Sequence, residues 1–417
     1  MPKPTSDCRA TERNHPWPMV RLGELGVMVR GNGIKRCETI ETGCPCLRYG
    51  EIYTSFNVIL DKPRSFVPKE LFDKSVKIKK GDLVFTLTGE NTEEIAKALA
   101  YLGDGEIAAG GDLAVWTGHG CDSKYLAYLM YSPQLISQKA ATGNGNIVVH
   151  TSIKKLQQLE IPLPSLPVQR EIVARLEREL AAVEKMKNGF EALAETAKQE
   201  FKAELKEVFE GLKSGGAEIG TDGTNGTVET RRLGEIGRVV TGTTPSKGNK
   251  SYYGGEWPFY KPADLNQGRN TIGSGDSLAD AGWQSARQLP ANSVLVTCIG
   301  ATLGKTGIIR REGSCNQQIN AIVCDGKTLP EYVYYSILSP QFQNMLWQSS
   351  NSTTLPMVNK STFEKFEIPF PALAVQREVV ARLDLAKARA EKLEAKAREG
   401  VSVCETMRKA ILKEAFE

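Results

Sequence analysis

The amino-acid sequence predicts an α+β protein in which two globular α/β-mixed domains with short β-strands are joined by two long antiparallel coiled-coil helices. Three observations predict this fold: an internal repeat, a repeated segment that starts a long helix, and a regular apolar spacing along both helices. Residues 160–176 (EIPLPSLPVQREIVARL) return as residues 367–383 (EIPFPALAVQREVVARL). Flanking matches keep the same separation without an insertion, so we expect an internal pseudo-two-fold repeat.

The repeat divides the chain into five segments. These are a first globular domain at 1–160, a central long helix at 161–213, a linker rich in Gly, Ser and Thr at 214–230, a second globular domain at 231–367 and a second long helix at 368–417. The sequence RLGE begins both domains, at Arg21 and at Arg232. We therefore expect each half to be a globular domain followed by its own helix.

Inside each domain, short apolar runs such as 82–88 and 292–297 are bounded by Gly, Pro and Asn, which is typical of strands between turns. A helix is predicted over 125–131 and again over 332–338, each ending at a Ser-Pro-Gln sequence and followed by a polar loop. The Ile-Pro-x-Pro segment that comes next is expected to be extended, because a residue before proline is pushed out of the α region.

The long helices are predicted to run from about Val168 to Leu212 and from about Val375 to Phe416. Apolar residues recur close to every 3.5 residues along the first helix, which predicts a coiled coil with one long partner. The seam includes Met186 and Leu193, and Phe190 is expected to face the small residues near Ala397. The predicted helix–helix and subunit interface consists of Val173, Leu176, Leu180, Phe190, Phe201, Leu205, Val380, Leu383, Leu393 and Leu412.

Composition excludes several classes of protein. The apolar fraction of 41% includes no run long enough to span a membrane, and the polar first eighteen residues contain no secretion signal. We therefore expect a cytoplasmic protein with no membrane association. The nine cysteines are scattered among only three histidines, so we expect reduced thiols and no metal site. The net charge of +4 is compatible with local basic patches.

A search for catalytic motifs returns one candidate, Gly300-Ala-Thr-Leu-Gly-Lys-Thr306. This sequence resembles a phosphate-binding loop, but it has three residues between its glycines where that loop needs four. We interpret it as a turn after the strand 294–298, with Lys305 at its tip. No methyltransferase, hydrolase or nuclease motif is visible. The sequence therefore favours a chain that binds and positions other molecules and leaves the chemistry to its partners.

Basic residues in the polar loops stand beside aromatic and amide residues, which are the side chains that hold phosphates and read base edges. For any one of them taken alone, an ordinary solvated loop is the favoured interpretation. The candidate DNA-binding residues of the first domain are Arg30, Lys35, Arg36, Tyr53, Asn57 and Lys97. Those of the second domain are Thr243, Ser246, Lys247, Lys250, Tyr260, Lys261, Arg269, Lys305, Gln317 and Gln318.

Together these features resemble the specificity subunit of type I restriction-modification systems, and the resemblance covers nearly the whole chain. The second domain carries GTTPS at 242–246, YGGEW at 253–257, Asp264-Leu265, GATLGK at 300–305 and NQQIN at 316–320, which are similar to that family's recurrent pattern. The first domain differs, with TGENTEE at 88–94 and GGD at 110–112.

The resemblance implies two target-recognition domains that read a bipartite double-stranded DNA sequence, one half-site each, on a non-catalytic chain. It implies two modification (methyltransferase) subunits and restriction (motor and nuclease) subunits as partners. S-adenosylmethionine, ATP and Mg are expected on those partners, and no cofactor is expected on this chain. Two alternatives remain open: an architectural coiled-coil protein that binds DNA without sequence preference, and an NTPase that uses residues 300–306.

Overall fold

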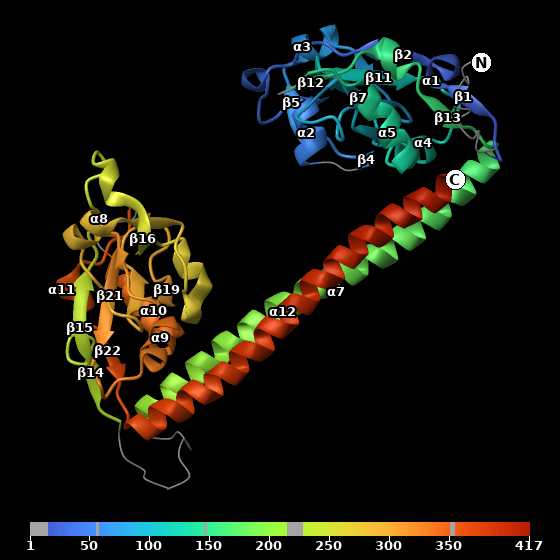
Figure 1. Ribbon diagram of the computed structural model, residues 1–417. Helices are drawn as coiled ribbons and strands as arrows, with labels where there is room; N and C mark the ends of the chain where they lie inside the picture. Colours follow the sequence, from blue (N-terminus) through green and yellow to red (C-terminus); the bar gives the residue numbers. More distant parts are fainter. Residues whose placement is uncertain (1–15, 56–57, 146–147, 215–227, 351–354) are drawn as a thin grey trace, which may run out of the picture. The chain divides into compact units, whose positions relative to one another are not determined.

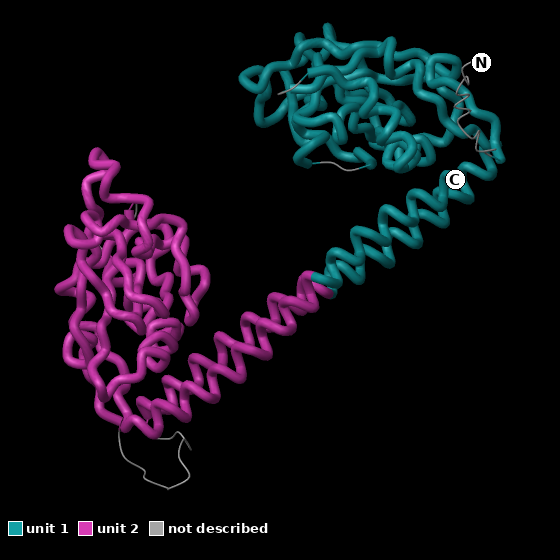
Figure 2. Tube along the Cα trace, in the orientation of Figure 1, with its two compact units in different colours: residues 1–189, 399–417 teal, residues 190–398 magenta. Residues whose placement is uncertain are grey.

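The computed structural model describes residues 16–55, 58–145, 148–214, 228–350 and 355–417 (Figure 1). The chain forms two compact units, and each combines one globular domain with parts of both long helices. The first unit contains residues 1–189 and 399–417, and the second contains residues 190–398 (Figure 2). Most of the predicted linker, residues 215–227, lies outside the described part of the chain.

The elements of the first globular domain are short. They are β1 (Met19–Arg21), α1 (Leu22–Leu25), β2 (Val27–Arg30), η1 (Arg36–Glu38), β3 (Cys44–Leu47), α2 (Tyr49–Thr54), β4 (Ile59–Leu60), β5 (Ser65–Val67), α3 (Lys69–Lys74), β6 (Lys77–Ile78), β7 (Leu83–Thr86), β8 (Thr88–Gly89), β9 (Ala98–Tyr101), β10 (Ile107–Ala109), β11 (Leu113–Thr117), α4 (Ser123–Leu129), α5 (Pro133–Thr142), β12 (Val149–His150), α6 (Ile153–Leu156) and β13 (Glu160–Pro162). Their main sheet has the order β2-β11-β7-β9-β4, and a second sheet has the order β5-β3-β10-β6.

The second globular domain is built in the same manner. Its elements are β14 (Thr230–Arg232), β15 (Gly237–Thr241), η2 (Lys250–Tyr252), β16 (Tyr253–Tyr260), η3 (Asp264–Asn270), β17 (Asp276–Leu278), α8 (Asp280–Ser285), β18 (Val294–Thr297), β19 (Thr306–Ile308), β20 (Ser314–Cys315), β21 (Ile319–Cys324), α9 (Pro330–Leu338), α10 (Pro340–Gln348), α11 (Lys360–Phe363) and β22 (Glu367–Pro369). An antiparallel sheet of order β15-β21-β18-β19 is accompanied by a smaller sheet of order β17-β16-β20.

The central strands β7 and β18 are buried along their whole length because both faces of each sheet are covered. In β7, Leu83 and Phe85 pack into one core, whereas Val84 packs into a second core on the opposite face. In β18, Val294 and Val296 are separated from Leu295 in the same manner. This alternation follows from the two-residue side-chain period of a strand.

Two contacts recur at equivalent positions and join each long helix to its globular domain. The Tyr125 hydroxyl donates to the carbonyl oxygen of Pro162 at 2.8 Å, and the Tyr332 hydroxyl donates to that of Pro369 at 2.6 Å. The glutamine of the repeated Val-Gln-Arg segment is buried in both units. Gln169 Oε1 accepts from the backbone N–H of Asp122, and Gln376 Oε1 accepts from that of Leu329. The internal repeat predicted from the sequence is therefore present in the packing.

The long helices are α7 (Leu166–Ser214) and α12 (Leu373–Phe416), within two residues of the predicted bounds. In the first unit, the beginning of α7 at Leu176 shares a core with Leu412 and Phe416 near the end of α12. In the second unit, the end of α7 at Leu205 shares a core with Val379 near the beginning of α12. The two helices therefore run antiparallel in both units, as predicted.

The predicted seam is wrong at two positions. Met186 and Leu193 are 42% and 37% exposed, so the apolar contact is interrupted along the middle of α7. In α12, the small residues Ala390 and Ala397 are buried.

A helix does end just before each Ser-Pro-Gln, because α4 ends at Leu129 and α9 ends at Leu338. The polar loop predicted to follow is wrong, because Ser-Pro-Gln starts a second helix in both domains. Ser132 caps α5, with its hydroxyl accepting from the N–H of Leu135, and Ser339 caps α10 in the same manner. Serine at the cap and proline in the first helical turn are start signals, and they override the polar composition of the residues after them.

Within the described residues, no helix is long and apolar enough to cross a membrane.

Candidate nucleic-acid interface

In the second unit, one end of the main sheet gathers three polar loops. Strand pairing aligns Thr241 with Asn320, Thr297 with Ile319, and Val296 with Thr306. The loops that follow β15, connect β18 to β19 and precede β21 therefore leave the sheet at the same end. We call residues 242–249, 298–305 and 316–318 the recognition loops of the second domain.

Backbone hydrogen bonds fix two of these loops against each other. Gly242 donates to the carbonyl oxygen of Ile319 at 2.9 Å, and Thr243 donates to that of Cys315 at 3.0 Å. A Cβ atom at Gly242 would lie 2.2 Å from the carbonyl oxygen of Asn316, so no other residue fits this crossing without a backbone shift. The loop backbone is therefore held rigidly while its tip stays exposed.

Side chains complete this contact. The Thr244 hydroxyl donates to Oε1 of the exposed Gln317. Arg287 donates its backbone N–H to Thr243 Oγ1 at 3.2 Å and its guanidinium to the carbonyl oxygen of Thr241 at 2.8 Å. The sequence analysis did not include Arg287, which lies outside every recognised motif. Its position beside the Thr-Thr-Pro-Ser segment is visible only in three dimensions.

Ser246, Lys247 and Lys250 are exposed beyond this crossing, and none of the three forms an ion pair with another described residue. Gln318 is half-buried, with its side-chain oxygen accepting from the Asn316 amide at 2.8 Å. The recognition loops thus present amides, hydroxyls and unpaired ammonium groups, which are the donors and acceptors that contact DNA bases and phosphates.

The glycine-rich loop at 300–305 is a β-hairpin connection, in agreement with its interpretation as a turn after a strand. It joins β18 to the antiparallel strand β19, whereas a phosphate-binding loop opens a helix. Its amide groups are used internally: Leu303 donates to Gly300, Gly304 to Thr297 and Lys305 to Thr302. These three N–H groups are not free to cradle a phosphate, which argues against the NTPase alternative. Lys305 is half-buried at the start of β19.

Three predicted DNA contacts of the second domain have structural roles instead. Tyr260 is fully buried, and burial raises its pKa to about 12. Lys261 forms an ion pair with Asp276. Arg269 forms an ion pair with Asp384 of α12, and the Tyr335 hydroxyl donates to the same carboxylate at 2.6 Å. Arg269 therefore holds the second domain to its helix, and the prediction of base or phosphate contact by Tyr260 is wrong because no part of its ring is accessible.

The first domain has an equivalent loop end. Strand pairing brings Arg30 beside Ala114, Leu113 beside Thr86, and Phe85 beside Ala98. The loops at 31–35, 87–97 and 110–112 therefore leave this sheet together. A Cβ at Gly31 would lie 2.1 Å from the carbonyl oxygen of Gly110, which reproduces the close crossing found at Gly242.

The predicted residues of the first domain differ in availability. Lys35 and Arg36 are exposed, without an ion pair in the described residues. Arg30 donates to the carbonyl oxygen of Gly111 at 3.0 Å and pairs with Asp112. Asn57 lies outside the described residues.

Tyr53 belongs to α2, and its side chain contacts the loop at 87–97. Its hydroxyl is within 2.8 Å of Thr86 Oγ1 and donates to the carbonyl oxygens of Thr88 and Glu94. The Lys97 ammonium lies 5.5 Å from the centre of its ring. Burial raises the pKa of Tyr53. Tyr53 therefore supports the loop from within, and its hydroxyl is not free to contact DNA.

All ten predicted helix-interface residues are at least half-buried. Val173, Leu176, Leu205, Leu383 and Leu412 are buried, and Leu180, Phe190, Phe201, Val380 and Leu393 are half-buried. An ion-pair cluster flanks this contact in the second unit, where Arg382 pairs with Glu204 and Glu207. Whether any of these side chains meets another subunit stays a prediction.

The described residues offer little for catalysis. No group of three or more His, Cys, Asp or Glu side chains among them is placed to hold a metal ion. Burial raises the pKa of Cys298 and Cys315 to about 12 and that of Cys46 to about 11, so these thiols stay protonated and unreactive at neutral pH.

The chain thus consists of two repeated α/β domains with anchored, polar loops, and comparisons with known proteins identify the family. The sequence matches the family described as "Type I restriction modification DNA specificity domain" twice, over residues 14–189 and 225–401. The chain belongs to this family.

Individual relatives belong to the same kind of protein. The chain is 34% identical over 160 residues to the specificity subunit of the type I restriction enzyme HindI from Haemophilus influenzae, a match that covers 37% of this chain and 35% of that protein. The matched region thus spans about a third of this relative's length.

Solved structures share the fold. A chain from a study of the assembly and conformational transition of the type I R-M system aligns with a TM-score of 0.73 and 19% identity, over 96% of this chain and 97% of that one. The HsdS subunit from Thermoanaerobacter tengcongensis aligns with a TM-score of 0.54 and 19% identity, over 96% of each chain.

Proposed function

We propose that this chain is the sequence-reading subunit of a type I restriction-modification complex, and that each globular domain reads one half of a bipartite DNA target. One observation carries the proposal: in both units, the polar loops leave the same end of the main sheet and cross at a glycine that admits no side chain. Family membership supports the same conclusion.

The arrangement of the loops suits recognition of a variable sequence. The central strands β7 and β18 beneath the loops are buried and carry the fold, whereas Lys247 and Gln317 are exposed on the loops of the second domain. Loops positioned by a rigid scaffold can change their side chains without a change of core. The sequence preference of each domain should therefore depend on its own loops.

The catalytic activities belong to other subunits under this proposal. Two modification subunits would bind this chain and supply S-adenosylmethionine-dependent methylation. Restriction subunits would supply ATP- and Mg-dependent translocation and cleavage. The chain itself would act in the cytoplasm without a cofactor. The relatives' names support these partners, since they describe specificity subunits of type I restriction enzymes.

The experiment is a domain exchange. Residues 231–366 are replaced by the corresponding domain of a relative with another target, and methylated sites are mapped genome-wide in cells that also carry the partner methyltransferase. We expect one half of the target to change while the other half is retained. The control exchanges a domain from a relative with the same half-site, which should leave the target unchanged.

Two outcomes would contradict the proposal. Loss of both half-sites together would show that the domains are not independent readers. Equal affinity for target and random duplex by the assembled complex would favour the alternative, an architectural coiled-coil protein that binds DNA without sequence preference.

A further inference from the structure

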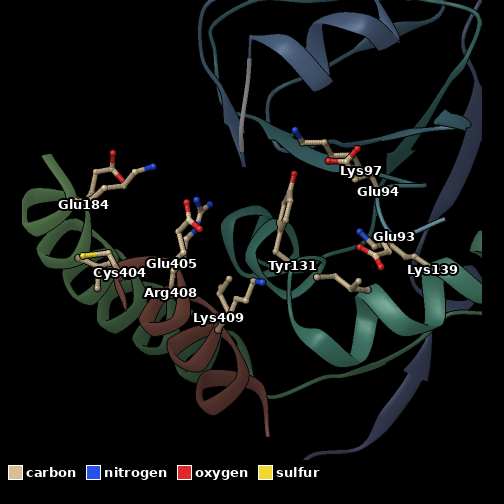
Figure 3. A pocket seen from close by; sticks show the side chains of 14 residues that line it. Glu93, Glu94, Lys97, Tyr131, Lys139, Glu184, Cys404, Glu405, Arg408 and Lys409 are labelled. Carbon is tan, nitrogen blue, oxygen red and sulfur yellow. The ribbon is translucent and has the colours of Figure 1, made fainter. Parts of the chain in front are cut away.

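A cavity of about 420 Å³ opens in the first unit between the globular domain and the long helices (Figure 3). This volume falls within the range of ~300–1,000 Å³ typical of small-molecule sites. Its walls come from the loop before β9, from α4 and α5, from the first half of α7 and from the end of α12. The residues that line it are Glu93, Glu94, Lys97, Tyr131, Ile136, Lys139, Val183, Glu184, Lys187, Cys404, Glu405, Arg408, Lys409 and Leu412.

The innermost charged group of this cavity is Lys139 of α5. Lys139 is only 3% exposed, and its ammonium donates to the carbonyl oxygen of Ala96 at 3.2 Å. The ammonium also lies 5.5 Å from the centre of the Tyr131 ring. An ammonium has three N–H donors, and a buried cation without a counter-ion is costly. Lys139 therefore has donor capacity that the described residues do not use.

Four further basic residues line the same cavity, namely Lys97, Lys187, Arg408 and Lys409. Lys97 is half-buried and Arg408 is exposed on α12, and within the described part of the chain no carboxylate forms an ion pair with either of them or with Lys139. Burial, with a smaller contribution from Lys97, lowers the pKa of Lys139 to about 7. Burial also lowers the pKa of Lys97, and Arg408 adds to this shift while Glu94 opposes it. The three positive groups thus repel one another across a shared space.

Among the residues that the structure describes, the carboxylates of the cavity form no ion pair with Lys139, Lys97 or Arg408, although Glu94 favours the charged form of Lys97. Glu93, Glu94, Glu184 and Glu405 are all exposed, so they lie at the rim and not on the buried wall. The Glu94 carboxylate accepts from the Asn91 amide at 3.1 Å. The buried wall of the cavity therefore carries the ammonium group of Lys139, whereas its solvent side has charges of both signs.

The second repeat has apolar residues at the positions equivalent to two of these cations. At the positions equivalent to Lys139 and Arg408, the second unit has Leu346 and Phe201. Leu346 is fully buried, and Phe201 packs edge-on against Tyr335 with 6.4 Å between ring centres. Apolar side chains thus satisfy the fold at this junction, so packing does not account for the two cations of the first unit.

We propose that this cavity is a binding site for a phosphoryl or similar tetrahedral dianion, held by Lys139, Lys97 and Arg408. The anion supplies the counter-charge that the described residues lack and accepts the unused N–H donors of Lys139. The group that carries the anion is either a small phosphorylated molecule or the backbone of a nucleic acid. The site does not depend on the sequence-reading role of the recognition loops.

The test uses the full chain and sulfate as the probe, because the charge of sulfate does not change between pH 6 and 9. Binding is measured by titration calorimetry and by the rise in thermal unfolding temperature. Lys139→Leu and Arg408→Gln should each weaken sulfate binding by about tenfold, which is the effect of losing one charged hydrogen bond. Lys139→Leu installs the side chain of the second repeat, and Arg408 is exposed, so both variants should fold.

The pH dependence distinguishes a bound anion from general charge screening. Lys139 loses its proton as the pH rises through about 7, so sulfate affinity should fall from pH 6 to pH 8.5 in the wild type and change less in Lys139→Leu. Lys62→Gln, which removes an exposed lysine outside the cavity, is the control and should bind like the wild type. Equal sulfate affinity in the wild type and Lys139→Leu would overturn the proposal.

The source of the anion is identified by a second titration with duplex DNA. If the DNA backbone occupies the site, sulfate should compete with DNA, and Arg408→Gln should reduce the log–log salt slope of DNA binding by about one. If a small molecule occupies it, the slope should stay unchanged and sulfate should still bind to the DNA-bound chain. Either result supports an anion site, whereas no sulfate binding together with an unchanged slope would refute it.

Discussion

At the residue scale, Gly242 shows how a missing side chain can position a recognition surface. The neighbouring backbone oxygens of Cys315 and Asn316 leave no room for a Cβ, and both belong to the segment that presents Gln317. The close crossing lets Thr243 and Thr244 hydrogen-bond to that segment. Loop geometry at this end of the sheet therefore depends on a residue that has no side chain.

Gly242→Ala should lower the free energy of unfolding by about 1–3 kcal/mol, because the new methyl group forces two backbone segments apart. It should also weaken specific DNA binding by the assembled complex more than nonspecific binding. Urea unfolding and equilibrium binding measure the two effects. Gly248→Ala is the matched control: its added Cβ would meet only a side-chain hydroxyl at 3.7 Å. Equal stability of the two variants would show that the crossing carries no strain.

Lys305→Ala should weaken DNA binding and reduce the log–log salt slope by about 0.9, the value for one phosphate contact. The nucleotide-binding alternative predicts a loss of ATP affinity instead, which the internal bonding of this loop argues against. Lys327→Ala is the control, since Lys327 is exposed just past β21, at the other end of the same sheet. A slope that stays at its wild-type value in Lys305→Ala would remove this residue from the interface.

Sequence reasoning selects residue types correctly but not their surroundings. Lys247 and Tyr260 are both selected because basic and aromatic side chains contact DNA. Lys247 is exposed, whereas Tyr260 is fully buried. A tyrosine at the end of an apolar strand has the same local sequence whether its ring points to solvent or to the core. Arg269 likewise pairs with a residue more than a hundred positions away, and no local pattern reveals such a partner.

At the element scale, the end of α12 completes the core of the first domain. Phe416 is 2% exposed and packs edge-on against Tyr125 of α4, with 5.5 Å between ring centres. Leu412 and Ala415 join the same core. This helix is thus a structural component of a domain that begins almost four hundred residues earlier.

Phe416→Ala should destabilise the first unit by about 3–5 kcal/mol, the usual cost of removing a buried aromatic ring. Met407→Ala, on the same helix but 39% exposed, should change stability by less than about 0.5 kcal/mol. Hydrogen exchange of the amides in α4 and β7 reports the loss locally. Unchanged protection there in Phe416→Ala would show that the contact with Tyr125 is dispensable.

The long helices are the most predictable elements because their apolar spacing extends over more than forty residues. The short helices α5 and α10 escape prediction because their sequences are polar and a serine followed by proline can mark the end of one helix as well as the start of the next. The internal repeat helps to locate such short elements, since every element found in one half can be sought at the equivalent position of the other. Sheet order is not predictable, because parallel pairs such as β4 with β9 depend on long-range contacts.

At the scale of the whole molecule, the two units differ in continuity. Residues 190–398 form an uninterrupted segment, whereas the first unit combines 1–189 with 399–417. The core of the second unit draws on α7 and α12 residues such as Leu205 and Leu383, which all lie inside its own segment. We therefore expect the second unit to fold alone.

A fragment of residues 190–398 should unfold cooperatively in urea. A fragment of residues 1–189 should have a broad transition and should bind a hydrophobic dye, because the partners of Tyr125 and Leu176 in its core are missing. Addition of a peptide with residues 399–417 should sharpen that transition, and the same peptide with Phe416→Ala should not. A sharp transition for 1–189 alone would contradict the contribution of α12 to this core.

The discontinuity of the first unit has a consequence for synthesis. A ribosome that adds ~5–20 residues per second completes residues 1–189 well before it reaches residue 399. During that interval the first domain lacks the side chains that close its core, and an apolar face of α4 is exposed to chaperones and proteases. The second unit is a continuous segment, so all of its core residues have been synthesised by residue 398, before the first unit receives residues 399–417. A frameshift or stop codon anywhere before residue 399 would therefore leave the first domain unfinished, so the cell could remove a truncated reader before it reached DNA.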